Sequence, residues 1–425
     1  MAMSPELATS IDAGSVASAS YRLSSAGFLP RAREWQAELY EKLSQQESDA
    51  GYLLAAPCGA GKTEAVVIPA LGVRRGGAPR RLFLIAQDGS PLDDYLYRIG
   101  PYLKSWASAD EVPRTLVVVP DAAAEECFGV RYCADGTEEP TEEMNPLEAD
   151  VDLVVTTFHR FLDLFFGGGG VHGLASAFAP AEGEALRRDL FFFDEAHGYS
   201  VDAFSRFHRL VEFLFAQDTD VIVASSTMPP PFQEELSFLE AIDAPGVLNA
   251  VAPTIQYLMT EDPLAEIEQQ IRHSYYINSR VFAVCETASD ADTLRSRLAG
   301  SYPHSVFLYH TEQPPSERRR IYAQLRELEK EGEGYLLLTT GNAVESSDLD
   351  ATVLISTVCP PENLIRRAGR CNRRGDLPDA KLIVVGAGIE HAARTLNLTQ
   401  ASAYLAYLRA AQNILFLPEE WRRFI

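Results

Sequence analysis

The fold is decided by the stretch Ala56-Pro57-Cys58-Gly59-Ala60-Gly61-Lys62-Thr63. It follows an apolar run, residues 51–55, and precedes a helix-forming segment that begins at Glu64. A strand, a glycine-rich loop, Lys-Thr and a helix are typical of a phosphate-binding loop, because the glycines permit a tight turn whose N–H groups point at phosphate oxygens. In such a loop Lys62 reaches the β- and γ-phosphates and the Thr63 hydroxyl binds Mg²⁺. The stretch therefore predicts a site for ATP and a magnesium ion.

Composition and length indicate a globular protein of two domains. The chain has 425 residues, of which 46% are hydrophobic and 23% charged, and one core rarely serves so long a chain. No apolar run is long enough to cross a membrane, and no secretion signal is evident at the start of the chain. The six cysteines include no Cys-x-x-Cys pair, which is typical of reduced thiols. We expect a cytoplasmic protein with no membrane partner.

The net charge of −23 sets a condition on nucleic-acid binding. A strongly acidic chain repels phosphate at long range, so a strand would need a local basic groove or delivery by a partner. Asp88, Asp93 and Asp94 follow an apolar run at residues 81–85 and are expected to repel a phosphate backbone. A second acidic segment, residues 134–152, is expected to be a solvated loop.

Apolar runs alternate with helical segments along most of the chain, which predicts an α/β fold with two parallel sheets flanked by helices. Several of the runs end in polar clusters, and in such sheets ligands lie at the carboxyl ends of the strands. The predicted organisation is a flexible arm (1–24), a first domain (25–244), a linker (245–254), a second domain (255–390) and a helical tail (391–425).

Two further clusters supply what an ATP site requires. Asp194 and Glu195 follow the apolar run 190–193, and ATP hydrolysis needs one carboxylate at the metal and another at the attacking water. In the second domain, the segment 366–374 contains five arginines. If it is helical, Arg366, Arg370 and Arg373 share one face. An arginine presented to the γ-phosphate accelerates hydrolysis by ~10³–10⁵.

Taken together, these motifs resemble a superfamily two helicase with a DEAH box. They are the phosphate loop, Asp194 to His197, Ser225 to Thr227, and Arg366 to Arg373. Within that superfamily the chain is most similar to the helicase part of the CRISPR type I effector helicase–nuclease, through residues 56–64, 226–229, 340–350 and 363–373. The likeness covers about residues 28–388. It implies two tandem RecA-like P-loop domains with ATP bound between them.

The resemblance also implies an activity: ATP-dependent 3′-to-5′ movement on single-stranded DNA that a crRNA-guided surveillance complex has displaced. It assigns Gln36 to adenine, with the loop residues Pro57 to Glu64 and Asp348 also at the nucleotide. Glu195, Lys62, Arg370 and Arg373 are the catalytic residues implied, and Thr63 and Asp194 the Mg²⁺ ligands. The resemblance further assigns His197, Ser225 and Thr227 to the coupling of the ATP site to movement of the DNA strand. Thr157 and Thr340 are assigned to contacts with that strand. A glutamine on the surface of the helix is the alternative for Gln36.

Some features depart from the family, and other functions stay open. Arg366 replaces the usual glutamine. The family's HD nuclease requires a His-Asp dipeptide, and none of the eight histidines precedes an aspartate. We therefore expect a helicase whose nuclease is a separate HD subunit. One alternative is a superfamily two helicase of DNA or RNA in repair or another defence system. Another is a nucleotide-gated adaptor that unwinds nothing, which the acidic segment at Asp88 to Asp94 favours.

Overall fold

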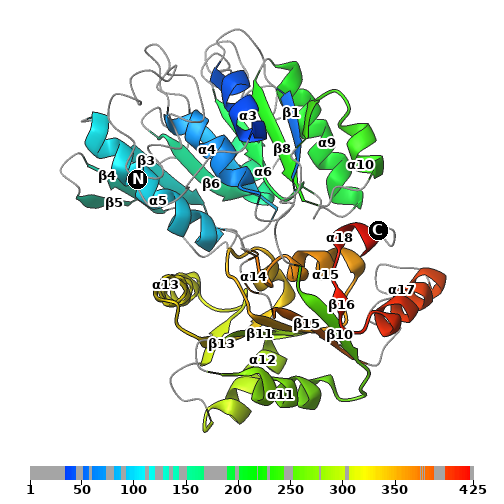
Figure 1. Ribbon diagram of the computed structural model, residues 1–425. Coiled ribbons are helices and arrows are strands. Elements are labelled where there is room, and N and C mark those ends of the chain that lie inside the picture. Colours follow the sequence, from blue (N-terminus) through cyan, green and yellow to red (C-terminus); the bar gives the residue numbers. More distant parts are fainter. Residues whose placement is uncertain are drawn as a thin grey trace. The chain divides into compact units, whose positions relative to one another are not determined.

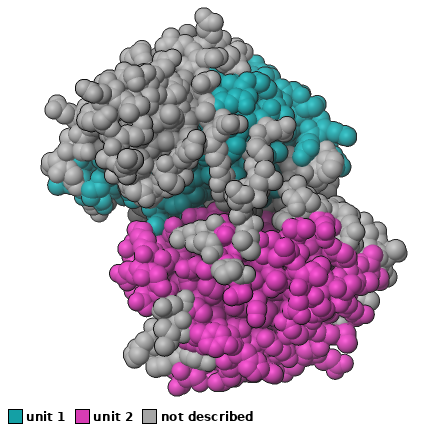
Figure 2. All heavy atoms as spheres, viewed as in Figure 1, with its two compact units in different colours: residues 1–246 teal, residues 247–425 magenta. Residues whose placement is uncertain are grey.

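The computed structural model divides into two units, residues 1–246 and 247–425 (Figure 2). The predicted linker, 245–254, spans this division. The residues described are 34–44, 51–56, 60–72, 81–87, 92–110, 114–119, 128–133, 137–142, 151–166, 189–196, 201–217, 219–226, 230–243, 252–276, 279–301, 306–373, 375, 377, 379–386 and 398–421.

The first unit contains a nine-stranded sheet with the order β5-β4-β3-β6-β2-β7-β8-β1-β9. All neighbouring strands are parallel except at the β3–β4 and β4–β5 pairs. The strands are β1 (Gly51–Ala55), β2 (Leu82–Ala86), β3 (Arg114–Val119), β4 (Phe128–Tyr132), β5 (Glu138–Glu142), β6 (Leu153–Thr157), β7 (Leu190–Phe193), β8 (Asp220–Ser225) and β9 (Glu240–Asp243).

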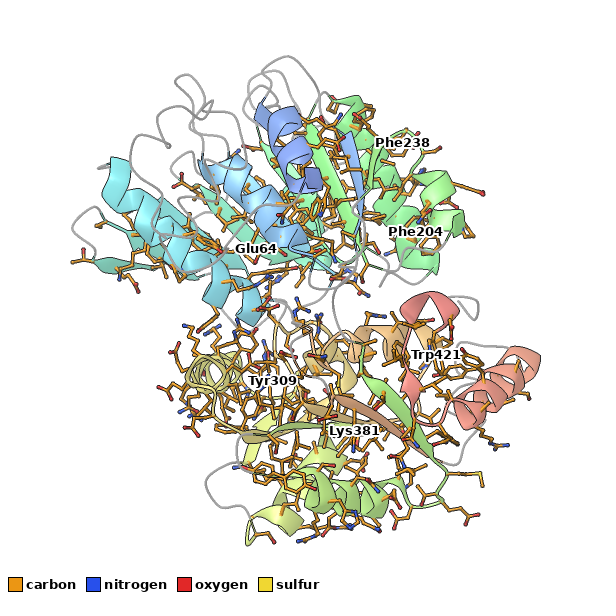
Figure 3. The ribbon with its side chains drawn as sticks, in the orientation of Figure 1. Glu64, Phe204, Phe238, Tyr309, Lys381 and Trp421 are labelled. Carbon is orange, nitrogen blue, oxygen red and sulfur yellow. The ribbon has the colours of Figure 1, made fainter. Side chains whose placement is uncertain are left out.

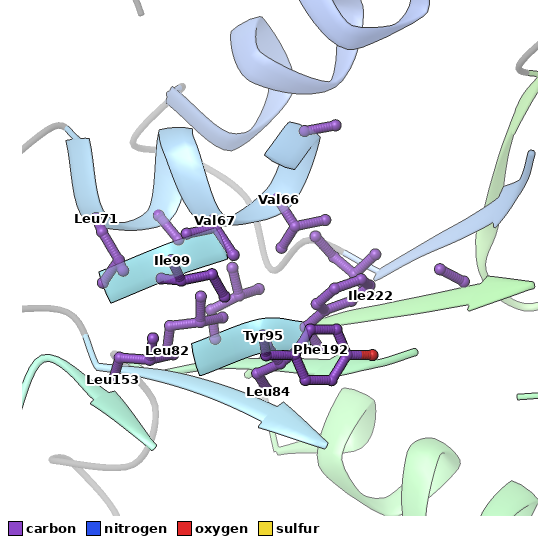
Figure 4. Close-up of a cluster of buried hydrophobic side chains, with 14 of the residues drawn as sticks. Val66, Val67, Leu71, Leu82, Leu84, Tyr95, Ile99, Leu153, Phe192 and Ile222 are labelled. Carbon is purple, nitrogen blue, oxygen red and sulfur yellow. The ribbon is translucent and has the colours of Figure 1, made fainter. Parts of the chain in front are cut away.

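Helices cover both faces of this sheet, which explains why its central strands are apolar at every position. In β2, Leu82 and Leu84 belong to one core and Phe83 and Ile85 to the other. The first core also contains residues of α3 (Glu34–Ser44), α4 (Lys62–Gly72) and α5 (Leu92–Asp110) (Figure 4). The second contains residues of α6 (Phe158–Phe166) and α9 (Val201–Ala216). A short helix, α10 (Pro230–Glu235), precedes β9.

The acidic segment expected to be a loop is in part a strand. Residues Glu138 to Glu142 form β5, which pairs antiparallel with β4 at the edge of the sheet. Edge strands are often charged, because charge discourages pairing with another chain. An acidic edge strand therefore has the composition of a loop, and the expectation was wrong for residues 138–142.

The second unit contains a seven-stranded sheet with the order β12-β13-β11-β14-β15-β10-β16. It is parallel except at the β10–β16 pair. The strands are β10 (Thr254–Leu258), β11 (Arg280–Cys285), β12 (Val306–Tyr309), β13 (Tyr335–Thr340), β14 (Val353–Thr357), β15 (Lys381–Val385) and β16 (Ile414–Leu415). The prediction of two parallel sheets flanked by helices is confirmed.

The helices of the second unit that lie in its described residues are shown in Figure 1. They are α11 (Pro263–Ser274), α12 (Ala288–Leu298), α13 (Pro315–Glu331), α14 (Gly341–Glu345), α15 (Pro361–Ala368), α17 (Leu398–Ala410) and α18 (Pro418–Trp421). Side chains of α11 and α12 share one core with the strands. The segment predicted as a tail packs onto this unit: β16 pairs with β10, and Trp421 (labelled in Figure 3) stacks on Phe416 with ring centroids 5.0 Å apart.

In the part of the chain that the structure describes, every helix is too short or too polar to cross a membrane.

Candidate nucleotide-binding site

The end of the phosphate loop is held by α3. Gly61 has φ +83°, a conformation that favours glycine, and a Cβ there would lie 2.8 Å from Gln36 Nε2. The buried Gln36 amide donates a hydrogen bond to the Gly61 carbonyl at 3.1 Å. The glutamine assigned to adenine therefore also supports the loop, and it is not the surface residue of the alternative interpretation. Pro57, Cys58 and Gly59 lie outside the described residues.

Lys62, the first residue of α4, lies between the phosphate loop and the Asp194-Glu195 pair. Its buried ammonium donates to the Ala56 carbonyl at 3.1 Å and lies 3.8 Å from Glu195 Oε1. The Ala56 N–H in turn donates to the carbonyl of Ser225, the last residue of β8. The fold thus brings three predicted site segments, which follow β1, β7 and β8, to one edge of the sheet.

Thr63 and Asp194 form the pair expected to bind a metal. The Thr63 hydroxyl donates to Asp194 Oδ2 at 3.2 Å, and both side chains are buried. Hydroxyl and carboxylate oxygens are the ligands that Mg²⁺ prefers, so the donor set fits this ion. Burial and the neighbouring Glu195 raise the pKa of Asp194 to about 6, and the Lys62 charge opposes that rise. A cation bound here would compensate the buried charge.

Glu195 adopts a conformation that is uncommon for residues other than glycine. Its φ is +57°, and its N–H donates to Asp194 Oδ1 at 3.0 Å. A positive φ at a bulky residue is strained and is found mostly at functional positions. The Ser226 hydroxyl donates to Glu195 Oε2 at 3.4 Å. His197 and Thr227, the other predicted residues of these two motifs, are outside the described residues.

Two residues of α5, Tyr95 and Arg98, contact the site, although neither belongs to a sequence motif. Tyr95 donates to Asp194 Oδ2 at 2.8 Å, and Arg98 Nη2 donates to the Thr63 hydroxyl at 3.3 Å. Arg98 also pairs with Asp94 at 2.8 Å and with Glu64, labelled in Figure 3, at 2.6 Å. Burial and the Asp194 charge raise the pKa of Tyr95 well above its ordinary value, so its hydroxyl stays protonated.

The position of Asp94 corrects one expectation from the sequence. Its side chain is 5% exposed and pairs with Arg98, so it does not face a nucleic-acid backbone. Asp88 and the side chain of Asp93 are outside the described residues. The i, i+4 spacing of Asp94 and Arg98, on the helix that follows β2, was the signal that could have revealed this pair.

In the second unit, the expected arginine helix is shorter than predicted. α15 ends at Ala368, so Arg370 and Arg373 lie beyond it and do not share a helical face with Arg366. The chain turns towards the sheet instead, because the Asn372 N–H donates to the Ala351 carbonyl and the Ala351 N–H to that of Arg370. Asn372 has φ +53°, a left-handed conformation in the turn that follows the helix.

Arg370 and Arg373 are held by different partners. Arg370 is buried and donates to the carbonyls of Val344 and Glu345. Its Nη1 has no hydrogen-bond partner within the described part of the chain. Arg373 Nη2 lies 2.5 Å from Asp348 Oδ1, and Arg326 of α13 lies 3.4 Å from the other oxygen of that carboxylate. Asp348, assigned to the nucleotide, is therefore also the support of Arg373.

A second carboxylate holds the arginines of α15. Glu345 Oε1 lies 2.7 Å from Arg367 Nε, and Oε2 lies 3.5 Å from Arg366 Nη1. Although burial alone would raise it, these two charges hold the pKa of Glu345 below its ordinary value. A side chain at Gly341 would collide with the Arg367 guanidinium. The arginine in place of glutamine at 366 is thus a half-buried member of the ion cluster around the buried Glu345.

The two threonines assigned to the DNA strand each lie at the end of a β-strand, one in each unit. Thr157 ends β6 and Thr340 ends β13. The buried Thr157 hydroxyl accepts a hydrogen bond from the Arg160 N–H at 3.4 Å at the start of α6, whereas Thr340 is partly exposed. Both positions are at the carboxyl ends of strands, the edge where ligands bind in such sheets.

Two family models match consecutive parts of the chain. The DEAD/DEAH box helicase model matches residues 33–236, and the model for the C-terminal part of the CRISPR-associated nuclease/helicase Cas3 matches residues 277–376. With the phosphate loop and the two sheets, these matches define an ATPase of two tandem RecA-like domains. More particularly, the chain is a superfamily two helicase of the ATP-hydrolysing class, with a DEAD/DEAH box domain followed by a Cas3-like domain.

Solved structures share the fold at low sequence identity. Cas3 of T. fusca with ATP has a TM-score of 0.67 and 18% identity, over 95% of this chain and 52% of that one. S. cerevisiae Dbp5 bound to RNA and ADP BeF3 has a TM-score of 0.63 and 15% identity, over 95% and 94%. The DUF1998 helicase MrfA bound to DNA has a TM-score of 0.60 and 17% identity, over 99% and 56%.

The chain therefore spans about half the length of the Cas3 structure that it matches. No curated protein matches it in sequence.

Proposed function

We propose that the chain is an ATP-driven motor that moves 3′-to-5′ along single-stranded DNA in CRISPR type I interference. In this proposal a crRNA-guided surveillance complex supplies the displaced strand and a separate HD subunit supplies the nuclease. The observation that carries the proposal is the Cas3 match over residues 277–376. This range contains the arginines that gather around Glu345 and around Asp348.

The described side chains of the first unit suit the hydrolysis step. Lys62 neutralises phosphate charge, and Thr63 with Asp194 would hold Mg²⁺, which supplies positive charge at the phosphate oxygens. Glu195 orients the attacking water and accepts its proton. Its 3.8 Å separation from Lys62 Nζ supports this role, because the base then lies beside the group that would face the γ-phosphate.

The second unit supplies arginines. Arg370 and Arg373 are proposed to neutralise the charge that develops on the γ-phosphate. Arg370 is supported by its unpartnered Nη1 among the described residues, since a buried N–H group without a partner is costly. Asp348 is proposed at the nucleotide. His197, Ser225 and Thr227 are proposed for coupling, and Thr157 and Thr340 for the strand.

The alternative functions differ in which nucleic acid the chain acts on, and in whether it acts on nucleic acid at all. Dbp5 is bound to RNA and MrfA to DNA, so an RNA helicase, or a DNA helicase outside CRISPR interference, is the second candidate. The adaptor that unwinds nothing loses part of its support, because Asp94 is buried and paired with Arg98.

The test is ATP turnover measured without nucleic acid, with single-stranded DNA, and with RNA of the same sequence. We expect stimulation by DNA that is larger than that by RNA and that disappears in Lys62→Ala. Larger stimulation by RNA would favour the RNA helicase, and flat turnover would favour the adaptor.

Direction and context need separate assays. Displacement of streptavidin from a biotinylated strand end should occur at the 5′ end, towards which a 3′-to-5′ motor moves. Displacement only at the 3′ end would contradict the proposed direction. Stimulation by a target-bound surveillance complex tests the CRISPR role, and no response to that complex would contradict it.

A further inference from the structure

α5 contacts the candidate nucleotide site through two side chains that belong to none of the recognised motifs. We propose that Tyr95 and Arg98 are positioning residues for the magnesium ligands, Tyr95 for the Asp194 carboxylate and Arg98 for the Thr63 hydroxyl. The inference rests on the magnesium–nucleotide site of the proposed function, and it adds to that site an element from outside the phosphate loop and the acidic motif.

Tyr95 completes a set of three donors around Asp194. Its hydroxyl and that of Thr63 both donate to Oδ2, at 2.8 and 3.2 Å, and the Glu195 N–H donates to Oδ1 at 3.0 Å. Both carboxylate oxygens are therefore held, and the side chain is buried with 3% of its area exposed. The phenol is the nearer of the two hydroxyl donors to Oδ2, so its loss would leave that oxygen held by the longer Thr63 contact alone.

Arg98 fixes the direction of the Thr63 hydroxyl. A guanidinium only donates, so Thr63 Oγ1 accepts from Arg98 Nη2 through one lone pair. The hydroxyl proton is directed to Asp194 Oδ2. This arrangement leaves the second lone pair of Oγ1 as the one available to a cation, and a metal ligand oriented in this way needs no rearrangement of its other contacts.

The charge around Arg98 is suited to a neighbouring cation. Glu64 lies 2.6 Å and Asp94 2.8 Å from its guanidinium nitrogens, so the three side chains together carry one negative charge. An unpaired arginine at this distance from Thr63 would repel Mg²⁺, whereas this cluster does not. The pairing also explains why an aspartate of α5 is buried.

The experiment measures the affinity of a fluorescent ATP analogue with Mg²⁺ and with EDTA, so that the readout is binding and not turnover. Tyr95→Phe keeps the ring in the core and removes only the hydroxyl. We expect the ratio of the two affinities to fall by about 10-fold or more, the effect typical of removing a group that orients a metal ligand. The affinity in EDTA and the melting temperature should stay near those of the wild type.

Tyr257→Phe is the matched control. The buried Tyr257 hydroxyl donates to the Gly386 carbonyl at 2.7 Å in the second unit, so its removal costs a similar hydrogen bond away from the nucleotide. Its affinity ratio should equal that of the wild type. A wild-type ratio in Tyr95→Phe would overturn the role of Tyr95.

Arg98→Lys separates positioning from charge. Lysine keeps the charge but lacks the planar fork that contacts Thr63, Glu64 and Asp94 together, so we expect a reduced ratio. A wild-type ratio in this variant would overturn positioning by Arg98. If the wild type itself binds the analogue equally with Mg²⁺ and EDTA, the magnesium site of the proposed function fails, and the inference fails with it.

Discussion

The Thr63 hydroxyl donates a hydrogen bond to Asp194 Oδ2 at 3.2 Å, although 131 residues separate the two in the chain. The contact arises because β1, β7 and β8 are parallel neighbours in the sheet and end at the same edge. The loop after β1 and the acids after β7 therefore meet across β8. A phosphate loop and a metal carboxylate are brought together by strand order rather than by any local sequence feature.

Lys62 is expected to be essential for turnover. Lys62→Ala removes a buried ammonium between the Ala56 carbonyl and Glu195, and loss of one preorganised charge donor typically costs about 10²–10³ in rate. The measurement is steady-state release of phosphate from ATP. Lys42→Ala is the control, because Lys42 pairs with Glu240 on the surface and should leave turnover unchanged. Activity of the wild-type level in Lys62→Ala would contradict the site.

Glu195→Gln is expected to bind ATP without hydrolysing it. The amide keeps the size of the side chain but cannot accept the proton of the attacking water. Retention of labelled ATP on the protein, followed over time together with release of product, measures both properties. Glu138→Gln, on the exposed edge strand β5, should behave as the wild type. Hydrolysis at the wild-type rate in Glu195→Gln would show that another group is the base.

Arg326→Met is expected to destabilise the second unit. Arg326 pairs with Glu329, whose side chain is 1% exposed, at 3.0 Å and with Asp348 at 3.4 Å. Removing one partner of a buried ion pair costs about 3–5 kcal/mol. Urea unfolding measures the free energy. Lys330→Ala, on the same helix, breaks an exposed pair with Glu327 and should cost no more than about 0.5 kcal/mol. Equal effects of the two variants would contradict the prediction.

The stability of the first unit should depend on pH through Asp194. Burial and Glu195 raise the pKa of this carboxyl from 3.8 to about 6, so between these values the folded state binds more protons than the unfolded state. The contribution of Asp194 to the free energy of unfolding therefore falls as pH rises from about 4 to 6. In EDTA without nucleotide, Asp194→Asn should lack this fall and be relatively more stable above pH 6. Parallel pH profiles of the two proteins would contradict the assignment.

Much of the fold and the centre of the site could be predicted from the sequence. Strands that are apolar at every position, such as Leu82 to Ala86, predict a sheet covered on both faces. The polar residues after Phe193 and Ser225 mark the edge at which the candidate site lies. Because parallel strands end at the same edge of a sheet, the sequence could predict that Lys62 and Glu195 lie on one edge. Their separation of 3.8 Å depends on the strand order β7-β8-β1.

The contacts that escaped prediction depend on packing between elements. Periodicity shows that α5 is a helix, but not the angle at which Tyr95 and Arg98 approach Asp194 and Thr63. The arginine segment has helical spacing, yet its backbone pairs with Ala351 beyond Ala368. In that case tertiary hydrogen bonds override a local helical preference.

Asp348 lies between two guanidiniums whose positions in the chain are far apart, one in α13 and one after α15. Replacing Arg326 by a neutral residue would leave Arg373 as the one arginine of this pair at Asp348. The net charge around the carboxylate would then fall by one unit. Among descendants of a common ancestor, substitutions at positions 326 and 348 should consequently be inherited as a pair. The correlation would be visible as covariation of positions 326 and 348 among related sequences, and it would show that the carboxylate that holds Arg373 is selected together with Arg326.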